Sequence, residues 1–408
     1  MLVCGIMTAL LALHLRIKAN RPQLRLFFFM ASATLLYTGH FIFFNGIKEA
    51  IPFSDTVYCF CNPAVYPLFY IYIEELTIRR PNRLWQFYYL LPAIICFLTV
   101  GFLYLLMDHA EMVAFIEYNL YHNDFSGLSG LAWWQGVAHT AVKVIHALEI
   151  PPVLYFGWKR ISHYDHLVKN YYSDTEGKTA GSIRSLLIVL VLASIASFVC
   201  NAIGRTHFNE SIWLAAVPLT TFSILLLIIG HVGLHQQFYI NDIDIDEIED
   251  DAFIPDDIKD DLGDKLLKLM DQEKYYLNPN LKIDELSKLL NSNRNYIYHT
   301  INMKMGLTFS EFINSKRIDY SAEMIENNPE IHLSEVATKS GFTSSSAFYR
   351  NFKHFKGCTP REFQQELLKN NTVPPERLFS NSFKKDLDKI WALKEDIPDP
   401  KKPTYRKH

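Results

Sequence analysis

The sequence reads Ile283-Asp-Glu-Leu-Ser-Lys-Leu-Leu, then Asn295-Tyr-Ile-Tyr-His-Thr-Ile-Asn, then Gly306-Leu-Thr-Phe-Ser-Glu-Phe, and further along it repeats this pattern. The second copy reads Leu333-Ser-Glu-Val-Ala-Thr-Lys-Ser-Gly-Phe, then Ser346-Ala-Phe-Tyr-Arg-Asn-Phe-Lys, then Gly357-Cys-Thr-Pro-Arg-Glu-Phe. The apolar positions, the glycine and the final Thr-x-x-Glu align between the two copies. Such a repeat indicates one supersecondary unit that is built twice.

Each copy has the parts of a helix-turn-helix. A short first helix with one apolar face leads into a polar turn. The second helix is then anchored by apolar residues that lie four positions apart. The residues that form these apolar faces are Leu286, Leu289, Leu290, Ile297 and Ile301 in the first copy, and Leu333, Val336, Ala337, Phe348 and Phe352 in the second.

The opposite face of each second helix is predicted to be free to enter a major groove of DNA. Arg and Asn side chains match the edges of bases, and Lys side chains match phosphates. We expect Arg294 and Arg350 to contact bases, and Lys353 and Lys356 to contact phosphates. The full set of predicted DNA-binding residues is Asn293, Arg294, Asn295, Tyr298, His299 and Asn302 in the first copy, and Ser345, Ser346, Tyr349, Arg350, Lys353 and Lys356 in the second.

A capping box follows the glycine in each copy. Thr308 with Glu311, and Thr359 with Glu362, are predicted to begin the next helix. In the first copy that helix runs from Phe309 to a stop at 328–329 and joins the two units. Its apolar residues should fix the separation of the two reading helices near the about 34 Å between successive major grooves. These packing residues are Phe309, Phe312, Ile313, Ala322 and Ile325.

These features resemble the DNA-binding domain of the AraC family of transcription regulators. The resemblance covers residues 260–368 or so, which is about a quarter of the chain, and it includes both units and the joining helix. Ile301-Asn302 stands where the family usually has Phe-Lys, and Cys358 precedes the Thr-Pro pair. The resemblance implies control of transcription, sites on double-stranded DNA that span two successive major grooves, and frequent self-association, for example as a homodimer.

Charge alone leaves a second interpretation open, in which the helix-turn-helix units dock a protein partner. Residues 274–369 contain thirteen Lys and Arg and ten Asp and Glu, a net charge of +3, which is modest for a DNA-binding domain. The basic residues nevertheless concentrate on the predicted reading helices. The doubled unit, more than the bulk charge, favours DNA.

The first half of the chain is a series of apolar runs. A membrane-spanning helix needs about 20 mostly apolar residues. Seven runs reach or approach this length, and the first begins at Met1 without a basic leader, which argues against a cleaved signal peptide. The runs are 2–15, 24–44, 57–73, 85–107, 132–158, 183–203 and 212–234.

Lys and Arg between the runs predict the orientation, because cytoplasmic loops are enriched in them. Twelve lie in alternate loops and two, Lys48 and Arg205, in the others. The amino end is therefore expected outside, and everything after residue 234 in the cytoplasm. Because that compartment contains the DNA, we expect a multi-pass protein of the bacterial cytoplasmic (inner) membrane.

Four polar residues share a stripe of the fifth run, with spacings of four, three and three: His139, Lys143, His146 and Glu149. A charge at membrane depth costs at least about 2.5 kcal/mol, so it needs a partner, a cavity or a ligand. The stripe is either a structural polar contact or a sensor site for a ligand or a proton. The signal, and any ligand or membrane partner, is not identified by the sequence.

The fold class is therefore predicted as all-α, with a seven-helix transmembrane bundle followed by a cytoplasmic domain of two helix-turn-helix units joined by a helix. The predicted domains are the sensor-like bundle (1–235), an acidic linker (236–261), the AraC-type domain (262–370) and a disordered tail (371–408). A short amphipathic helix over 262–270 should open the third of these. The linker is interpreted as a solvated spacer, or as a segment that repels the anionic inner leaflet of the membrane or competes with DNA for the reading helices.

No nucleophile motif, phosphate-binding glycine loop or Cys/His metal spacing is present in the sequence, so we expect no enzyme, no cofactor and no metal. The predicted function is a membrane-integral, one-component transcription regulator. The alternative is a membrane transporter or sensor whose cytoplasmic domain docks a protein partner. Internal symmetry in the membrane half, typical of transporters, is not apparent.

Overall fold

The computed structural model describes residues 1–17, 20–78, 81–203, 212–235 and 256–370. The described residues form helices and connecting turns with no strand, so the all-α prediction is confirmed. The chain divides into two units. The first comprises residues 1–273 and 280–313, and the second comprises residues 274–279 and 314–408. The acidic stretch 236–255 and the tail 371–408 lie outside the described residues.

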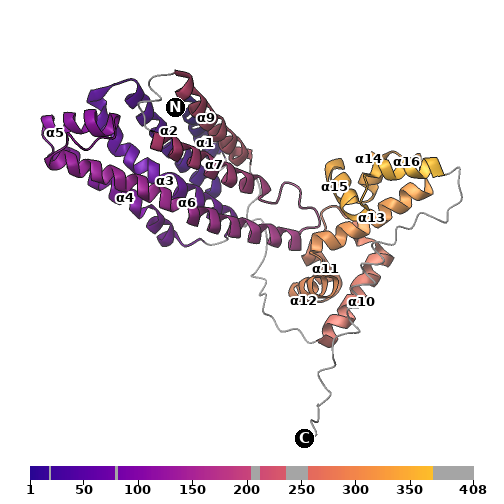
Figure 1. Ribbon diagram of the computed structural model, residues 1–408. Helices are drawn as coiled ribbons and strands as arrows, with labels where there is room; N and C mark the ends of the chain where they lie inside the picture. Colours follow the sequence, from indigo (N-terminus) through magenta and orange to yellow (C-terminus); the bar gives the residue numbers. More distant parts are fainter. Residues whose placement is uncertain (18–19, 79–80, 204–211, 236–255, 371–408) are drawn as a thin grey trace, which may run out of the picture. The chain divides into compact units, whose positions relative to one another are not determined.

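The amino-terminal part of the first unit contains seven long helices among the described residues, and each of the seven apolar runs lies largely or wholly in one of them. Figure 1 shows them, from indigo to dark red, packed side by side. A long helix forms here because each run lacks turn-forming clusters, and Asn82 caps one of them by accepting from the backbone N–H of Leu84 at 3.0 Å. The seven are α1 (Leu2–Ile17), α2 (Arg21–Phe44), α3 (Ile51–Thr77), α4 (Arg83–Leu106), α6 (Gly130–Tyr171), α7 (Gly181–Ile203) and α9 (Ile212–His235).

Two of the described helices, α2 and α4, are long and apolar enough to cross a membrane. Shorter apolar helices are found over Leu2–Arg16, Gly181–Leu192 and Thr220–His235. Short elements complete this part of the chain. They are η1 (Lys48–Ala50), α5 (His109–Ala114) and the π-helical η2 (Phe115–Tyr121).

Two buried glutamates at the end of α3 connect three helices of the bundle. Glu75 accepts from Nε of Arg25 on α2 at 3.1 Å. Its neighbour Glu74 pairs with Arg160 on α6 at 3.3 Å. Because removing one member of a buried pair leaves the other charge uncompensated, these pairs hold the ends of α2, α3 and α6 together.

The first unit also contains the first helix-turn-helix. It consists of α10 (Asp256–Glu273), α11 (Ile283–Leu289), α12 (Arg294–His299), the π-helical η5 (Thr300–Lys304) and the start of α13 (Phe309–Asn327). The predicted amphipathic helix is confirmed as part of α10, where Leu262, Leu266 and Met270 are buried. The prediction that Leu289 belongs to the buried apolar face of α11 is wrong. Leu289 is 44% exposed, because Ile283 and Leu286 turn inward and Leu289 falls on another side of this short helix.

The second unit contains the second helix-turn-helix, with α14 (Leu333–Lys339), α15 (Ser345–Lys356) and α16 (Pro360–Asn370), after the short η4 (Tyr275–Leu277). Phe348 and Phe352 are fully buried, as predicted, and pack with Val336, Ile318 and Ile325. The glycine stop is confirmed at Gly357, which has a φ of +77°. The capping box that follows it is also present, because Thr359 N–H donates to Glu362 at 2.7 Å.

One charged residue lies inside this second core. Arg317 on α13 is 1% exposed, and its guanidinium donates to the carbonyls of Tyr276 and Asn278 at 2.6 and 2.7 Å. It also donates to the side chain of Asn314 and lies 5.7 Å from the ring centre of Phe342. Arg317 thus fastens the segment 274–279 to α13.

Candidate nucleic-acid interface

The reading helix of the second unit, α15, presents its predicted face to solvent. Ser344 caps it by accepting from the N–H of Ala347 at 3.1 Å. Phe348 and Phe352 hold the opposite face in the core. The predicted residues Ser345, Ser346, Tyr349, Arg350, Lys353 and Lys356 are all exposed.

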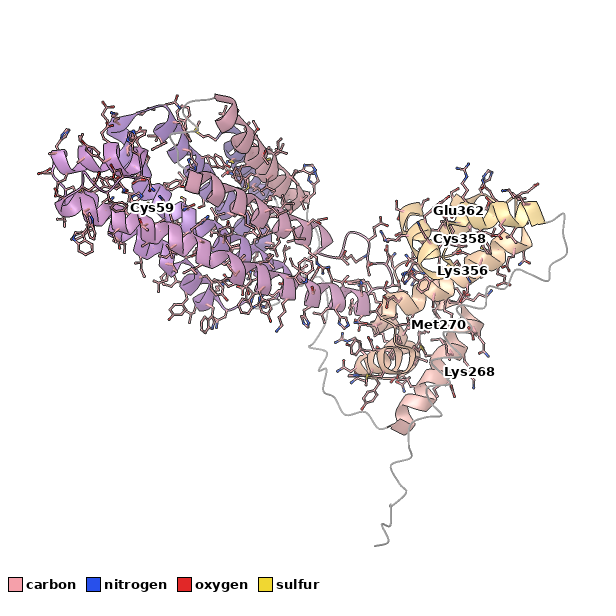
Figure 2. The ribbon with its side chains drawn as sticks, viewed as in Figure 1. Cys59, Lys268, Met270, Lys356, Cys358 and Glu362 are labelled. Carbon is pink, nitrogen blue, oxygen red and sulfur yellow. The ribbon has the colours of Figure 1, made fainter. Side chains whose placement is uncertain are left out.

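Charge on α15 increases towards its end. The last turn contains Lys353, His354 and Lys356, without a carboxylate on this helix. Lys356 pairs with Asp319 of α13 at 2.8 Å, and Figure 2 labels Lys356 near the end of α15. Both members of that pair are solvent-accessible, so exchanging Asp319 for a phosphate costs little.

The reading helix of the first unit, α12, is arranged differently. Asn293, predicted to bind DNA, caps the helix by accepting from the N–H of Asn295 at 2.9 Å. Tyr298 is only 7% exposed, contrary to the expectation of an open face. His299 and Asn302 are half-buried, as are Arg294 and Asn295. The expected free surface is thus partly covered.

Part of the cover comes from α6, where the rings of His166 and Tyr298 lie 6.5 Å apart. The residues at the end of this helix, 170–173, make further contacts, and we call them the docking segment. The backbone of Tyr172 forms an antiparallel bridge with Lys282, and Ser173 N–H donates to the carbonyl of Leu281 at 3.0 Å. The carbonyl of Ser173 accepts from the Ser310 hydroxyl at 3.0 Å. These backbone contacts attach α6 to the segment that precedes α11 and to the start of α13.

One side chain of the docking segment contacts a predicted reading residue directly, and a second reaches another one through Asp284. Asn170 Oδ1 accepts from the amide of Asn302 at 3.2 Å and from the N–H of Phe309 at 3.3 Å. Tyr171 donates its hydroxyl to Asp284 at 2.5 Å, and the other oxygen of that carboxylate pairs with Arg294 at 3.1 Å. Arg294, the predicted base contact, is therefore held by Asp284 beside the docking segment.

The Tyr171 phenol is protonated across the physiological pH range. Burial, and next the hydrogen bond to Asp284, raise the pKa of Tyr171 above its ordinary value. The phenol therefore remains a donor at neutral pH. A hydrogen bond from a neutral hydroxyl to a carboxylate stabilises by about 1.5–3 kcal/mol.

Loosening this contact should strengthen DNA binding. We expect Tyr171→Phe, which removes only the hydroxyl, to increase the affinity of the full-length protein for duplex DNA about tenfold, because detaching the docking segment from the first helix-turn-helix then costs less. Titration of a labelled duplex at constant salt measures the change. Tyr155→Phe, at an exposed position of the same helix, should bind as the unaltered protein does. An unchanged or weaker affinity of Tyr171→Phe would show that the docking segment does not restrain α12.

The predicted sensor stripe of α6 is not brought together at one site. His139 faces Asp55 on α3, with 3.0 Å between Nε2 and Oδ2. Lys143 is exposed and donates to Asn123 at 3.2 Å, whereas His146 contacts the carbonyl of Asn62 at 2.9 Å. The carboxylate oxygens of Glu149 are buried and have no hydrogen-bond partner in the described part of the chain. The four residues point to separate surroundings.

Sequence reasoning missed Asp284, Asp55 and the docking segment. The docking contacts join residues more than 100 positions apart, so no local pattern predicts them. The burial of Arg317, in contrast, could have been predicted from the sequence. Arg317 lies one turn after Ile313 on the apolar stripe of α13, where a charged residue requires buried partners.

Comparison with known proteins supports the helix-turn-helix assignment. Residues 286–366 match the family model described as a helix-turn-helix domain. A stretch of 90 residues is 31% identical to the Msm operon regulatory protein of Streptococcus mutans and covers 22% of this chain and 32% of that protein. A stretch of 101 residues is 26% identical to an uncharacterized HTH-type transcriptional regulator of Staphylococcus aureus, and covers 25% of this chain and 13% of that protein. No solved structure matches the chain.

The carboxy-terminal residues 286–366 thus form a helix-turn-helix domain of the AraC type, as predicted. The chain spans a third or less of the length of these curated relatives. The matched region includes α12 and α15, the two predicted reading helices.

Proposed function

We propose that the protein is a membrane-integral, sequence-specific DNA-binding regulator of transcription. The exposed polar and basic face of α15 carries the DNA-binding part of this proposal. It offers an Arg for base edges and two Lys for phosphates on a helix whose other face is locked in a core. The similarity of stretches of 90 and 101 residues to an operon regulatory protein and to an HTH-type transcriptional regulator also supports this part of the proposal.

The outer surface of α4 supports the membrane part. Large apolar side chains at spacings of three and four residues form an exposed row along α4. The most exposed of them is Leu105, at 85%. Monomeric soluble proteins rarely expose a continuous apolar patch of this kind, whereas lipid covers it without cost. The residues in the row are Phe87, Leu91, Ile95, Leu98, Phe102 and Leu105.

In this proposal the seven long helices form a transmembrane bundle with the amino end outside and the DNA-binding domain in the cytoplasm of a bacterial cell. Lys and Arg in alternate loops support that orientation. The bundle responds to a signal, and α6 transmits the response because it runs unbroken from Gly130 to the docking segment. Self-association as a homodimer belongs to the same proposal.

The test uses inverted membrane vesicles, which turn the cytoplasmic side outward. After an alkaline wash that strips peripheral proteins, the vesicles should retain the protein and select duplexes from random DNA. Arg350→Ala should relax the preference in one block of bases, and Arg294→Ala in a block about ten base pairs away. In each variant, the free-energy difference between the preferred base and the other bases should fall by about 1–3 kcal/mol.

The matched control is Lys353→Ala, which should weaken all sequences alike and lower the salt slope by about one. Removal of the protein by the alkaline wash would contradict the membrane assignment. Retained protein without any selected sequence would contradict specific DNA reading. If both Arg variants lost affinity uniformly, the assignment of these arginines to bases would be wrong.

A further inference from the structure

A buried group of three potential metal ligands joins α3 and α6. Asp55 and Cys59 lie four residues apart and therefore on one face of α3, and His139 faces them from α6. All three are buried, at 8, 0 and 8% exposure. Figure 2 labels Cys59 among the helices of the bundle.

The ligand atoms converge on one point. His139 Nε2 lies 3.0 Å from Asp55 Oδ2 and 3.8 Å from Cys59 Sγ, and the three atoms all lie within 4.8 Å of one another. In a tetrahedral zinc site the expected separations are about 3.3 Å for oxygen and nitrogen and about 3.5 Å for sulfur and nitrogen. The two separations that involve His139 lie within about 0.3 Å of those values.

A single hydrogen bond from His139 to one neighbour explains this arrangement less well than a bound cation does. His139 Nε2 carries at most one proton, and it faces both a carboxylate and a thiol. A divalent cation at the centre would satisfy all three atoms at once. It would also be neutral overall in apolar surroundings, since the carboxylate and the thiolate together balance two positive charges.

The surroundings of the group resemble the outer shell of a metal site. Tyr104 on α4 donates its hydroxyl to Asp55 Oδ2 at 2.8 Å and so orients the carboxylate. Gln135 lies one turn before His139, is completely buried, and its Oε1 has no partner among the residues that the structure describes. It offers an acceptor for a water molecule in the fourth position.

A pocket borders the group of three at one of its members. A pocket between α2 and α3 is lined by His40, Ser54, Asp55 and Tyr58. Asp55 therefore belongs both to this pocket and to the group of three.

We propose that Asp55, Cys59 and His139 bind a divalent transition-metal ion of intermediate softness, such as Zn²⁺. One oxygen, one nitrogen and one sulfur ligand suit such an ion better than Mg²⁺ or Ca²⁺, which require oxygen ligands. The ion would bridge α3 to α6, the helix that ends at the docking segment. Its role as the signal rests on the proposed function, whereas its binding does not.

The test measures metal binding by the full-length protein in detergent, after treatment with a chelator. Zn²⁺ titration against a competing indicator should give one ion per chain. Co²⁺ should give the absorption of a four-coordinate site together with a thiolate-to-metal charge-transfer band. Asp55→Asn, Cys59→Ser and His139→Gln should each weaken Zn²⁺ binding at least about 100-fold, since even outer-shell changes cost about 10–100-fold.

Cys61→Ser is the matched control, because Cys61 is equally buried on α3 but lies two positions further along and outside the group. It should bind Zn²⁺ as the unaltered protein does. Cys59→Ser should abolish only the charge-transfer band if it still binds Co²⁺ at high concentration, which separates loss of a ligand from misfolding. Absence of a bound ion in the unaltered protein, or equal effects of the two cysteine variants, would overturn the proposal.

DNA affinity measured on the same preparations distinguishes the two proposals. If the protein selects DNA but binds no metal, the metal site fails and the proposed function stands. If it binds metal but no DNA, the site stands and the proposed function fails. A change in DNA affinity on adding Zn²⁺, absent in Cys59→Ser and present in Cys61→Ser, would identify the ion as the signal.

Discussion

Arg317→Met should lower the free energy of unfolding of the second unit by about 3 kcal/mol, although the substitution keeps the volume and the apolar stem. The loss comes from two buried backbone carbonyls that would no longer have a hydrogen-bond donor. The carbonyls of Tyr276 and Asn278 accept from the guanidinium at 2.6 and 2.7 Å, and a buried acceptor without a partner costs about 1–3 kcal/mol. Methionine cannot donate to either.

Proteolysis pulses at increasing urea concentrations measure this loss on the full-length protein through the survival of the carboxy-terminal fragment. The midpoint should move to lower urea with the same slope. Arg361→Met, at an exposed position of α16, is the control and should change stability by less than about 0.5 kcal/mol. Equal midpoints for the two variants would refute a structural role for the Arg317 guanidinium.

Gly341→Ala should destabilise the second helix-turn-helix by more than about 3 kcal/mol, whereas Gly357→Ala should cost about 1–2 kcal/mol. Both glycines have positive φ, +82° and +77°. A Cβ at Gly341 would lie 2.5 Å from the carbonyl oxygen of Leu277 and 2.9 Å from its carbon, and this backbone cannot move aside as a flexible side chain could. A Cβ at Gly357 would meet no atom within 4 Å.

The comparison of the two glycines isolates the steric contribution, because the conformational cost is nearly shared. The same urea midpoints provide the measurement. If the two variants were equally stable, the close approach of residues 274–279 to the turn between α14 and α15 would not exist in solution. If both were as stable as the unaltered protein, neither positive φ would be required.

The local architecture could be predicted from the sequence because its determinants are close together in the chain. The anchors Ile297, Ile301, Phe348 and Phe352 are fully buried. The joining helix begins at Phe309, and its capping box is formed by Thr308 and Glu311, as expected. Short-range periodicity and capping chemistry are sufficient for such features.

The candidate site was predicted only in part, for reasons that depend on distance along the chain. Ser345 and Arg350 are exposed as expected, since a single helix and its core decide their position. Tyr298 is buried and has His166 of α6 beside it, a residue from another part of the chain, and no periodicity predicts such a contact. The stripe of α6 was recognised correctly as polar, but each member meets a partner that only the packing of helices selects, as His139 meets Asp55.

The unequal exposure of the two reading helices has a consequence for how tightly the protein holds DNA. Under the proposed function, a chain with α15 open and α12 covered would bind a duplex through one unit only. If the docking segment released α12, the second contact would form within a complex that already exists, which raises its effective concentration. Small changes in docking energy would then produce large changes in avidity and residence time, without a new contact on α15.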